Sequence, residues 1–128
     1  YVSDIQYTAG FYRELSPGFL SFLLNIQGLR APDPNGPFTY CELACGQGFG
    51  TNVLAAAYPN GRFWGFDFNP AQIANATRLA TAAGLSNVEF GEESFESLVQ
   101  GSRPDLPKFD YITLHGIYSW ISAENRGY

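Results

Sequence analysis

Hydrophobic positions along the chain fall into short apolar runs that alternate with segments in which apolar residues recur every three to four positions. The apolar runs at 38–43, 62–66, 87–90 and 109–114 predict four strands. The segments 17–27, 51–58, 70–83 and 95–99 predict helices, two of which begin with a polar cap followed by proline, at Ser16 and Asn69. This alternation indicates an α/β fold with a doubly wound parallel sheet.

A proline-rich loop at 31–37 separates two parts of the chain. Residues 1–37 are predicted to form an N-terminal helical cap segment, and residues 38–128 carry the sheet. A sheet of about four strands is short, and its last strand would leave apolar faces uncovered. The sequence also lacks methionine, and therefore an initiator. We expect residues 38–128 to be part of a domain whose remaining strands follow on the C-terminal side.

Composition and charge narrow the class of protein. The 128 residues carry a net charge of −5, and the seven Lys and Arg residues are scattered, which disfavours binding to a nucleic-acid backbone. No apolar run approaches the roughly 18 residues of a membrane span. Cys41 and Cys45 lie on an extended stretch, too far apart for a disulfide, so we expect free thiols and a cytoplasmic protein. No second Cys or His cluster accompanies them, and we expect no metal site.

A glycine-rich turn, ELACGQGFG at 42–50, joins the first predicted strand to the next helix. Glycines let a ligand approach the backbone, and the helix presents unpaired N–H groups. Asp67 ends the second predicted strand about 20 residues after Gly48, which is the separation typical of a carboxylate that binds ribose hydroxyls. The pattern predicts an adenosine-containing ligand. A carboxylate at Glu42 would disfavour a pyrophosphate here and would suit a cationic group such as an ammonium.

At this point the sequence resembles the class I S-adenosylmethionine-dependent methyltransferases, which have a Rossmann-like fold. Their first motif, Asp/Glu-x-Gly-x-Gly-x-Gly, reads here Glu42-x-Ala44-x-Gly46-x-Gly48, so that Ala44 replaces a family glycine. The resemblance implies S-adenosyl-L-methionine as cofactor, Asp67 as ribose ligand, Phe68 beside the adenine, and Glu92 or Glu93 near the adenine amino group. The full set of candidate cofactor-binding residues is Glu42, Ala44, Cys45, Gly46, Gly48, Asp67, Phe68, Asn69, Glu92, Glu93, Ser94 and His115.

The resemblance extends along the chain. The segments YRELSP, GFDFNPAQI, AAGLSNVEF and FDYITLHGIYSWIS look like a bacterial branch in which a methyltransferase domain precedes a methyltransferase regulatory domain. The resemblance implies that this chain is the N-terminal portion, with such a domain following in cis. Some members of the branch are linked to protein lysine methylation. The acceptor is an unidentified protein or small molecule, with a protein lysine as one option.

Residues that would face the acceptor come from the segment after the fourth predicted strand and from the N-terminal segment. His115, the single histidine, and Tyr118, Ser119 and Trp120 follow the fourth predicted strand, where ligands bind. His115 is a candidate catalytic residue, or a histidine that shapes its loop through backbone hydrogen bonds. Tyr7 and Tyr12 are predicted to close over the cofactor or to cap the core, and Trp120 forms a substrate wall or packs.

Several alternatives stay open at this stage. Glu42 would cap the glycine loop if it were purely structural, and Asp67 would cap the following helix. A non-catalytic S-adenosylmethionine-binding module would carry the same motifs, because methyl transfer requires no fixed catalytic residue. An NAD-dependent oxidoreductase would share the fold and Asp67, but Glu42 and the glycine spacing argue against it.

Overall fold

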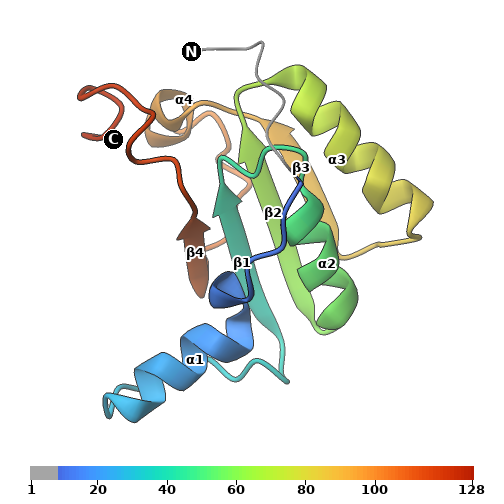
Figure 1. Cartoon of the computed structure of the whole chain (residues 1–128), viewed down its shortest axis with the longest axis vertical. Helices are drawn as coiled ribbons and strands as arrows, with labels where there is room; N and C mark the ends of the chain where they lie inside the picture. The colour runs from blue at the N-terminus through green and yellow to red at the C-terminus, as the bar shows by residue number, and fades with distance from the viewer. Residues whose placement is uncertain (1–8) are drawn as a thin grey trace.

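A four-stranded, all-parallel sheet forms the centre of residues 9–128, the part of the chain that this computed structural model describes (Figure 1). The strands occur in the order β3-β2-β1-β4. Their bounds are Phe38–Leu43 for β1, Gly61–Asp67 for β2, Val88–Glu92 for β3 and Tyr111–Leu114 for β4. The helices are α1 at Pro17–Ile26, α2 at Phe49–Ala57, α3 at Pro70–Ala82 and α4 at Phe95–Val99, with a 3-10 turn, η1, at Arg13–Leu15. The predicted α/β class and the four parallel strands are confirmed.

The helix starts follow the caps that the sequence predicts. The side chain of Ser16 accepts a hydrogen bond from the Phe19 N–H at 3.3 Å, and that of Asn69 accepts from the Ala71 N–H at 3.0 Å. Helix α2 differs from the prediction, because it begins two residues earlier than expected. Its cap is Gly48, a residue in the left-handed region with φ +65°, rather than a polar side chain. The bounds of β1 agree with the prediction, and those of β2, β3 and β4 differ from it by one or two residues.

Each face of the sheet has its own core. On one face, Phe38, Tyr40 and Phe63 pack with Leu54 of α2 and with Leu20 of α1. On the other face the buried residues Cys41, Trp64 and Phe66 pack with Leu98 of α4 and with Leu106 and Phe109. Figure 1 shows α2 and α3 on one side of the sheet and α4 on the other. The doubly wound prediction is therefore correct.

Tyrosine hydroxyls join the N-terminal segment to the sheet. The hydroxyl of Tyr40 in β1 donates to the carbonyl of Leu15 at 3.1 Å and receives a hydrogen bond from Thr113 of β4 at 2.7 Å. The hydroxyls of Ser21 in α1 and Tyr111 in β4 lie 2.7 Å apart. Burial of these polar groups requires such partners, so the contacts hold η1 and α1 against β1 and β4.

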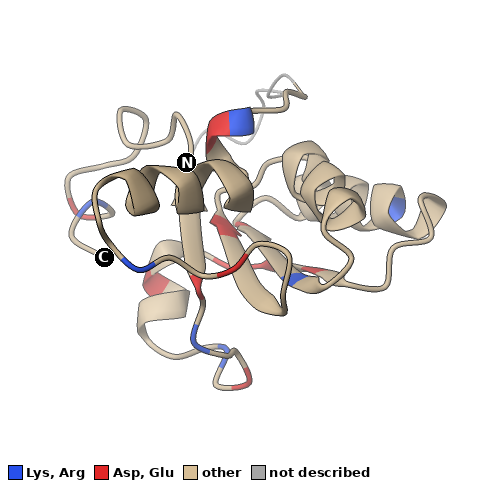
Figure 2. Ribbon diagram, turned by 90° about the horizontal axis from the view of Figure 1, so that it is seen from below, with Lys and Arg blue, Asp and Glu red and all other residues tan. Residues whose placement is uncertain are grey.

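Charged residues are dispersed over the surface. Figure 2 shows the Lys and Arg residues on separate loops and elements, with no basic stripe along one face of residues 9–128. Asp110, at the start of β4, accepts hydrogen bonds from the backbone N–H and the hydroxyl of Thr39 and ties β4 to β1. Within the same residues, no helix has the length and apolar character needed to cross a membrane. Cys41 and Cys45 are free thiols, as predicted.

Gly48 gives a test of how tightly α2 packs on its neighbours. A Cβ atom at Gly48 would lie 2.5 Å from the Cβ of Ala76 and 2.7 Å from the ring of Phe90. We expect Gly48→Ala to lower the free energy of unfolding by about 3 kcal/mol, because overpacking adds to the cost of a left-handed backbone. Chemical denaturation of the purified protein measures this loss.

The matched control is Gly84→Ala. Gly84 has a nearly equal φ of +66°, but nothing lies within 4 Å of its added Cβ. This variant should lose only about 1 kcal/mol, the cost of the backbone conformation alone. Equal losses in the two variants would mean that the contact of Gly48 with Ala76 and Phe90 is not tight.

Candidate functional site

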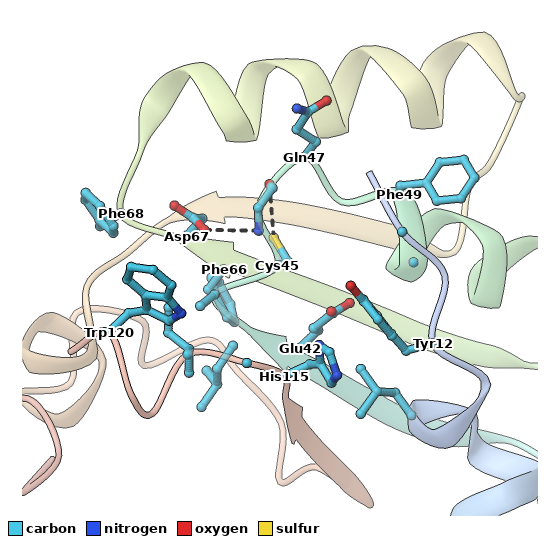
Figure 3. Close-up of a pocket in the computed structure, with 18 of the residues that line it drawn as sticks. Tyr12, Glu42, Cys45, Gln47, Phe49, Phe66, Asp67, Phe68, His115 and Trp120 are labelled. Atoms are coloured by element: carbon cyan, nitrogen blue, oxygen red, sulfur yellow. Dashed lines mark hydrogen bonds between the residues drawn. The ribbon is translucent and has the colours of Figure 1, made fainter. Parts of the chain in front are cut away.

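A cavity of about 520 Å³ opens at the carboxyl ends of the strands, where parallel α/β sheets bind ligands. Its walls come from the N-terminal segment, the loop after β1, the end of β2, the start of α4 and the segment after β4. Figure 3 shows Tyr12, Glu42 and His115 toward one end of it, and Asp67, Phe68 and Trp120 toward the other. The volume is in the range of cavities that hold a cofactor-sized molecule.

Strand alternation brings the polar side chains of this cavity to one face of the sheet. Glu42 has the same parity along β1 as Tyr40, and Asp67 has the same parity along β2 as Phe63. Both carboxylates therefore lie on the side of the sheet that α2 covers. His115 continues the alternation of β4 on that side, after Tyr111 and Thr113. The three residues line the same cavity because neighbouring parallel strands end at the same edge of the sheet.

Asp67 organises the glycine loop. Its side chain is 6% exposed, and its two carboxylate oxygens accept hydrogen bonds from the backbone N–H groups of Gly46 at 3.0 Å and Asn69 at 2.9 Å. A carboxylate has about four acceptor positions, so oxygen lone pairs remain for a ligand. Gly46 has φ +54°, and nothing lies within 4 Å of a Cβ added there. A side chain at Gly46 would project into the cavity, so the loop forms a cradle that a ligand can approach.

Glu42 is half-buried next to the first turn of α2. The hydroxyl of Thr51 donates a short hydrogen bond to its Oε2. Burial raises the pKa of Glu42 above its usual value of 4.5, and the hydrogen bond from Thr51 lowers it in part. Burial likewise raises the pKa of Cys41 to about 12, with Glu42 adding to the shift, and raises that of Cys45 further. Both thiols are therefore neutral at physiological pH and are poor nucleophiles.

The charged side chains that line the cavity are mostly acidic. Glu42, Asp67 and Glu93 contribute carboxylates, while none of the described lining residues is lysine or arginine. His115 is the basic group among them. Anionic groups without fixed cations attract a positively charged ligand and repel a pyrophosphate. The charge of the cavity therefore favours a ligand with cationic character.

Most of the residues predicted from the sequence line this cavity. They are Glu42, Ala44, Cys45, Gly46, Asp67, Phe68, Glu93, Ser94 and His115 from the cofactor set, and Tyr12 and Trp120 from the substrate or lid set. Tyr12 and His115 stack, with ring centroids 3.8 Å apart and planes 27° apart. Trp120 is 74% exposed and lies at the same end of the cavity as Phe68 (Figure 3). Tyr7 lies outside the described residues.

Ser119, which is exposed, and four further predicted residues do not line the cavity. Gly48 caps α2 and faces Ala76 and Phe90, so its glycine serves close packing. Asn69 caps α3 with its side chain. The ring of Tyr118 faces the guanidinium of Arg126, 4.9 Å from its carbon. The fourth, Glu92, is exposed at the end of β3.

Between the two adjacent glutamates, Glu93 is the one at the cavity. Its carboxylate accepts hydrogen bonds from the hydroxyls of Ser97 at 2.6 Å and Ser102 at 2.8 Å. Its backbone N–H donates to the carbonyl of Asp67 at 3.0 Å. These contacts fix the start of α4 beside the end of β2. The alternative in which Asp67 caps α3 does not hold, because the side chain of Asn69 is the cap, as the sequence predicts.

Sequence reasoning missed part of the wall. Phe66, Phe95 and Leu98 line the cavity and surround its apolar end, although the sequence marked them only as core or helix positions. Thr51, which is fully buried and binds Glu42, was also missed. A polar residue in the first turn after a glycine loop is a signal that could have identified Thr51, since the N-terminus of that helix faces the loop.

Ala44 occupies a position that favours glycine. Its φ of 55° lies in the left-handed region, the one such non-glycine residue in the described part of the chain. We expect Ala44→Gly to raise the free energy of unfolding by about 1 kcal/mol, because glycine removes the left-handed penalty. Ala74→Gly, on the exposed face of α3, should instead lower stability by about 1 kcal/mol. Thermal unfolding compares the two, and a destabilised Ala44→Gly variant would contradict the expectation.

Comparison with known proteins now identifies the class of this site. A family model described as "Methyltransferase domain" matches residues 36–126, and the chain belongs to this family. A curated relative, the uncharacterized protein sll1526 of Synechocystis, is 49% identical over 98% of this chain and 24% of its own length. The chain thus spans about a quarter of the length of that relative.

Solved structures agree with the family. PKMT2 from Rickettsia typhi, in complex with AdoHcy, matches 94% of this chain and 22% of its own with 28% identity and a TM-score of 0.84. The [4+2]-cyclase SpnF matches 61% of this chain and 27% of its own with a TM-score of 0.50 at 24% identity, a likeness of fold alone. The family and the AdoHcy-bound neighbour support S-adenosylmethionine as the cofactor, as the sequence predicts.

Proposed function

We propose that this chain binds S-adenosyl-L-methionine and that the protein transfers its methyl group to an amine acceptor, with a protein lysine as the favoured class. The observation that carries the proposal is the charge of the cavity. Carboxylates of Glu42, Asp67 and Glu93 line it without a described lysine or arginine. Such a site suits a cofactor that carries a sulfonium and an ammonium group.

The residues of the cavity fit the parts of this cofactor. Glu42 would receive the ammonium group of the methionyl part, and the remaining lone pairs of Asp67 would accept the ribose hydroxyls. The adenine would lie beside Phe68, and Glu93, which lines the cavity and bonds through its backbone N–H to Asp67, would be the acid near its amino group. Gly46 would allow the methionyl part to approach the loop backbone.

In this reaction the main task of the protein would be to position the acceptor next to the cofactor. When bound, S-adenosylmethionine supplies an activated methyl group on a sulfonium. The walls of the cavity would hold the acceptor nitrogen in line with that group and exclude water. The nitrogen lone pair forms the new C–N bond as the S–C bond breaks, and the acceptor then loses a proton. His115, stacked on Tyr12 beside Glu42, is placed to receive that proton directly or through water.

The amine acceptor rests on three supports. The negative cavity would attract a protonated amine. Because carboxylates favour the charged form of an amine, a base such as His115 would have to take up its proton. The neighbouring structure is PKMT2, and the sequence resembles a branch with protein lysine methylation. The stack of Tyr12 on His115 would provide aromatic surface for an alkyl amine. We further propose that a regulatory domain follows in the same protein and that the protein is cytoplasmic.

A non-catalytic binding module is the second candidate. The likeness to a [4+2]-cyclase shows that this fold alone does not specify methyl transfer. An NAD-dependent oxidoreductase fits less well, because a pyrophosphate would face the carboxylates of Glu42 and Asp67. These candidates differ in whether a methyl group leaves the cofactor.

Incubation of the protein with cofactor labelled in its methyl group tests the proposal. Lysine-containing peptides, free lysine and a bacterial lysate serve as acceptors. We expect label in the peptide or protein fraction, and loss of that label in an Asp67→Ala variant but not in an Asp105→Ala surface variant. Tight cofactor binding with no labelled acceptor would favour the binding module instead.

A further inference from the structure

We infer that Thr51 is a positioning residue that keeps Glu42 ionised to receive the ammonium group of the cofactor, so that cofactor affinity depends on pH through this pair. The inference rests on the proposed function and goes beyond it. It assigns to a residue on α2, which does not line the cavity, a role in setting the charge of one that does.

The geometry around Thr51 supports this role. Thr51 is fully buried in the first turn of α2, and its hydroxyl donates to Oε2 of Glu42. Gly50, in the first turn of α2, lies near the same carboxylate, since a Cβ at Gly50 would lie 3.9 Å from that oxygen. A hydrogen bond and the positive end of a helix both favour the charged form of an acid. Burial acts in the opposite direction, and Thr51 partly offsets it.

The other titratable groups around Glu42 do not replace Thr51. In β1 and the loop after it, burial raises the pKa values of Tyr40, Cys41 and Cys45, so these groups carry no charge near neutral pH. Asp67 at the end of β2 adds negative charge, which disfavours a second carboxylate. Tyr12 and His115 face the cavity from the N-terminal segment and from the end of β4.

The consequence is a defined pH profile. A protonated Glu42 cannot pair with an ammonium group, so binding of the cofactor requires the proton to leave. Affinity of the wild type should therefore rise as the pH rises toward and past the pKa of Glu42, and then level off. Removal of the Thr51 hydroxyl leaves burial uncompensated, so the rise should move to higher pH.

The experiment is calorimetric titration of S-adenosylhomocysteine, which keeps the ammonium group, at several values between pH 5 and 9. Thr51→Val removes the hydroxyl, and Thr51→Ser keeps it. We expect Thr51→Val to bind about tenfold more weakly than the wild type at the acidic end, with the deficit shrinking toward pH 9. Thr51→Ser should follow the wild-type profile. Every other residue is unchanged in both variants, so a difference between them arises from the hydroxyl of Thr51.

The outcomes separate this inference from the proposed function. Wild-type binding with an equal loss at every pH in Thr51→Val would show a merely structural role and overturn the inference alone. No binding by the wild type at any pH would overturn the proposed function and the inference with it. If Thr51→Val unfolds, the smaller Thr51→Ala variant makes the same comparison. Thr81→Val, which removes an exposed hydroxyl on α3, controls for helix effects and should match the wild type.

Discussion

Replacement of Asp67 by alanine is expected to weaken the binding of S-adenosylhomocysteine about a hundredfold. The variant would lack the hydrogen bonds between this carboxylate and the ribose hydroxyls, and hydrogen bonds to a charged acceptor contribute about 1.5–3 kcal/mol each. It would also release the N–H of Gly46, which shapes the glycine loop. Calorimetry at pH 8 measures the loss.

Two variants serve as controls for this prediction. Cys45→Ser changes a lining residue of the same loop whose thiol is neutral, and it should alter affinity little. Asp105→Ala removes a carboxylate that pairs with Arg103 on the surface, and it should leave binding unchanged. Comparable losses in Asp67→Ala and Cys45→Ser would mean that the loop is not the ligand cradle described above.

Glu42→Gln is expected to weaken cofactor binding by about tenfold to a hundredfold while it stabilises the ligand-free protein. Gln keeps an oxygen that can accept the bond from Thr51, but it loses the charge that pairs with an ammonium group. Calorimetry with S-adenosylhomocysteine measures the first effect. Thermal unfolding of the ligand-free protein measures the second.

The sign of the stability effect follows from the pKa of Glu42. Burial raises this pKa, so the folded state binds the proton more tightly than the unfolded state does. The contribution of Glu42 to stability is thus fully present below the usual glutamate pKa of 4.5, and it is lost as the pH rises through the raised value. Glu42→Gln has no such loss, so its advantage should begin above pH 4.5 and be complete above the raised value. A variant less stable than the wild type at pH 8 would contradict this account.

Element order and sheet topology followed from the sequence because the signals are local. Caps at Ser16 and Asn69 with prolines behind them mark helix starts, and short apolar runs between glycine turns mark strands. The start of α2 was harder to predict. A glycine in the left-handed region caps it, and only the fit of Phe90 against Gly48 shows why that glycine is there.

The site was predicted best where strand alternation applies. Glu42 lies near the end of β1, Asp67 ends β2 and His115 follows β4, and all three have the alternation that points side chains to the α2 side of the sheet. Their place in one cavity is therefore implied by the sequence. The choice of Glu93 over Glu92 depended on the hydroxyls of Ser97 and Ser102, which come from α4 and the turn after it. Such tertiary partners have no local signature.

The position of the lid residues also required the structure. Tyr12 lies far from His115 in sequence, and their stack depends on the hydroxyl of Tyr40 that anchors η1 to β1. Tyr118 lies two residues before Trp120, which lines the cavity, yet the ring of Tyr118 faces the guanidinium of Arg126. Two aromatic residues that look alike in the sequence therefore differ in their contacts, because tertiary partners decide where each ring packs.

The central claim is that the cavity selects S-adenosylmethionine through its carboxylates, and one pair of titrations tests it most directly. The protein is titrated at pH 8 with S-adenosylhomocysteine and, in parallel, with NADH. The account predicts saturable binding of S-adenosylhomocysteine and none of NADH, since the pyrophosphate would face Glu42 and Asp67 without a described lysine or arginine in the cavity. Tight binding of NADH without binding of S-adenosylhomocysteine would contradict it.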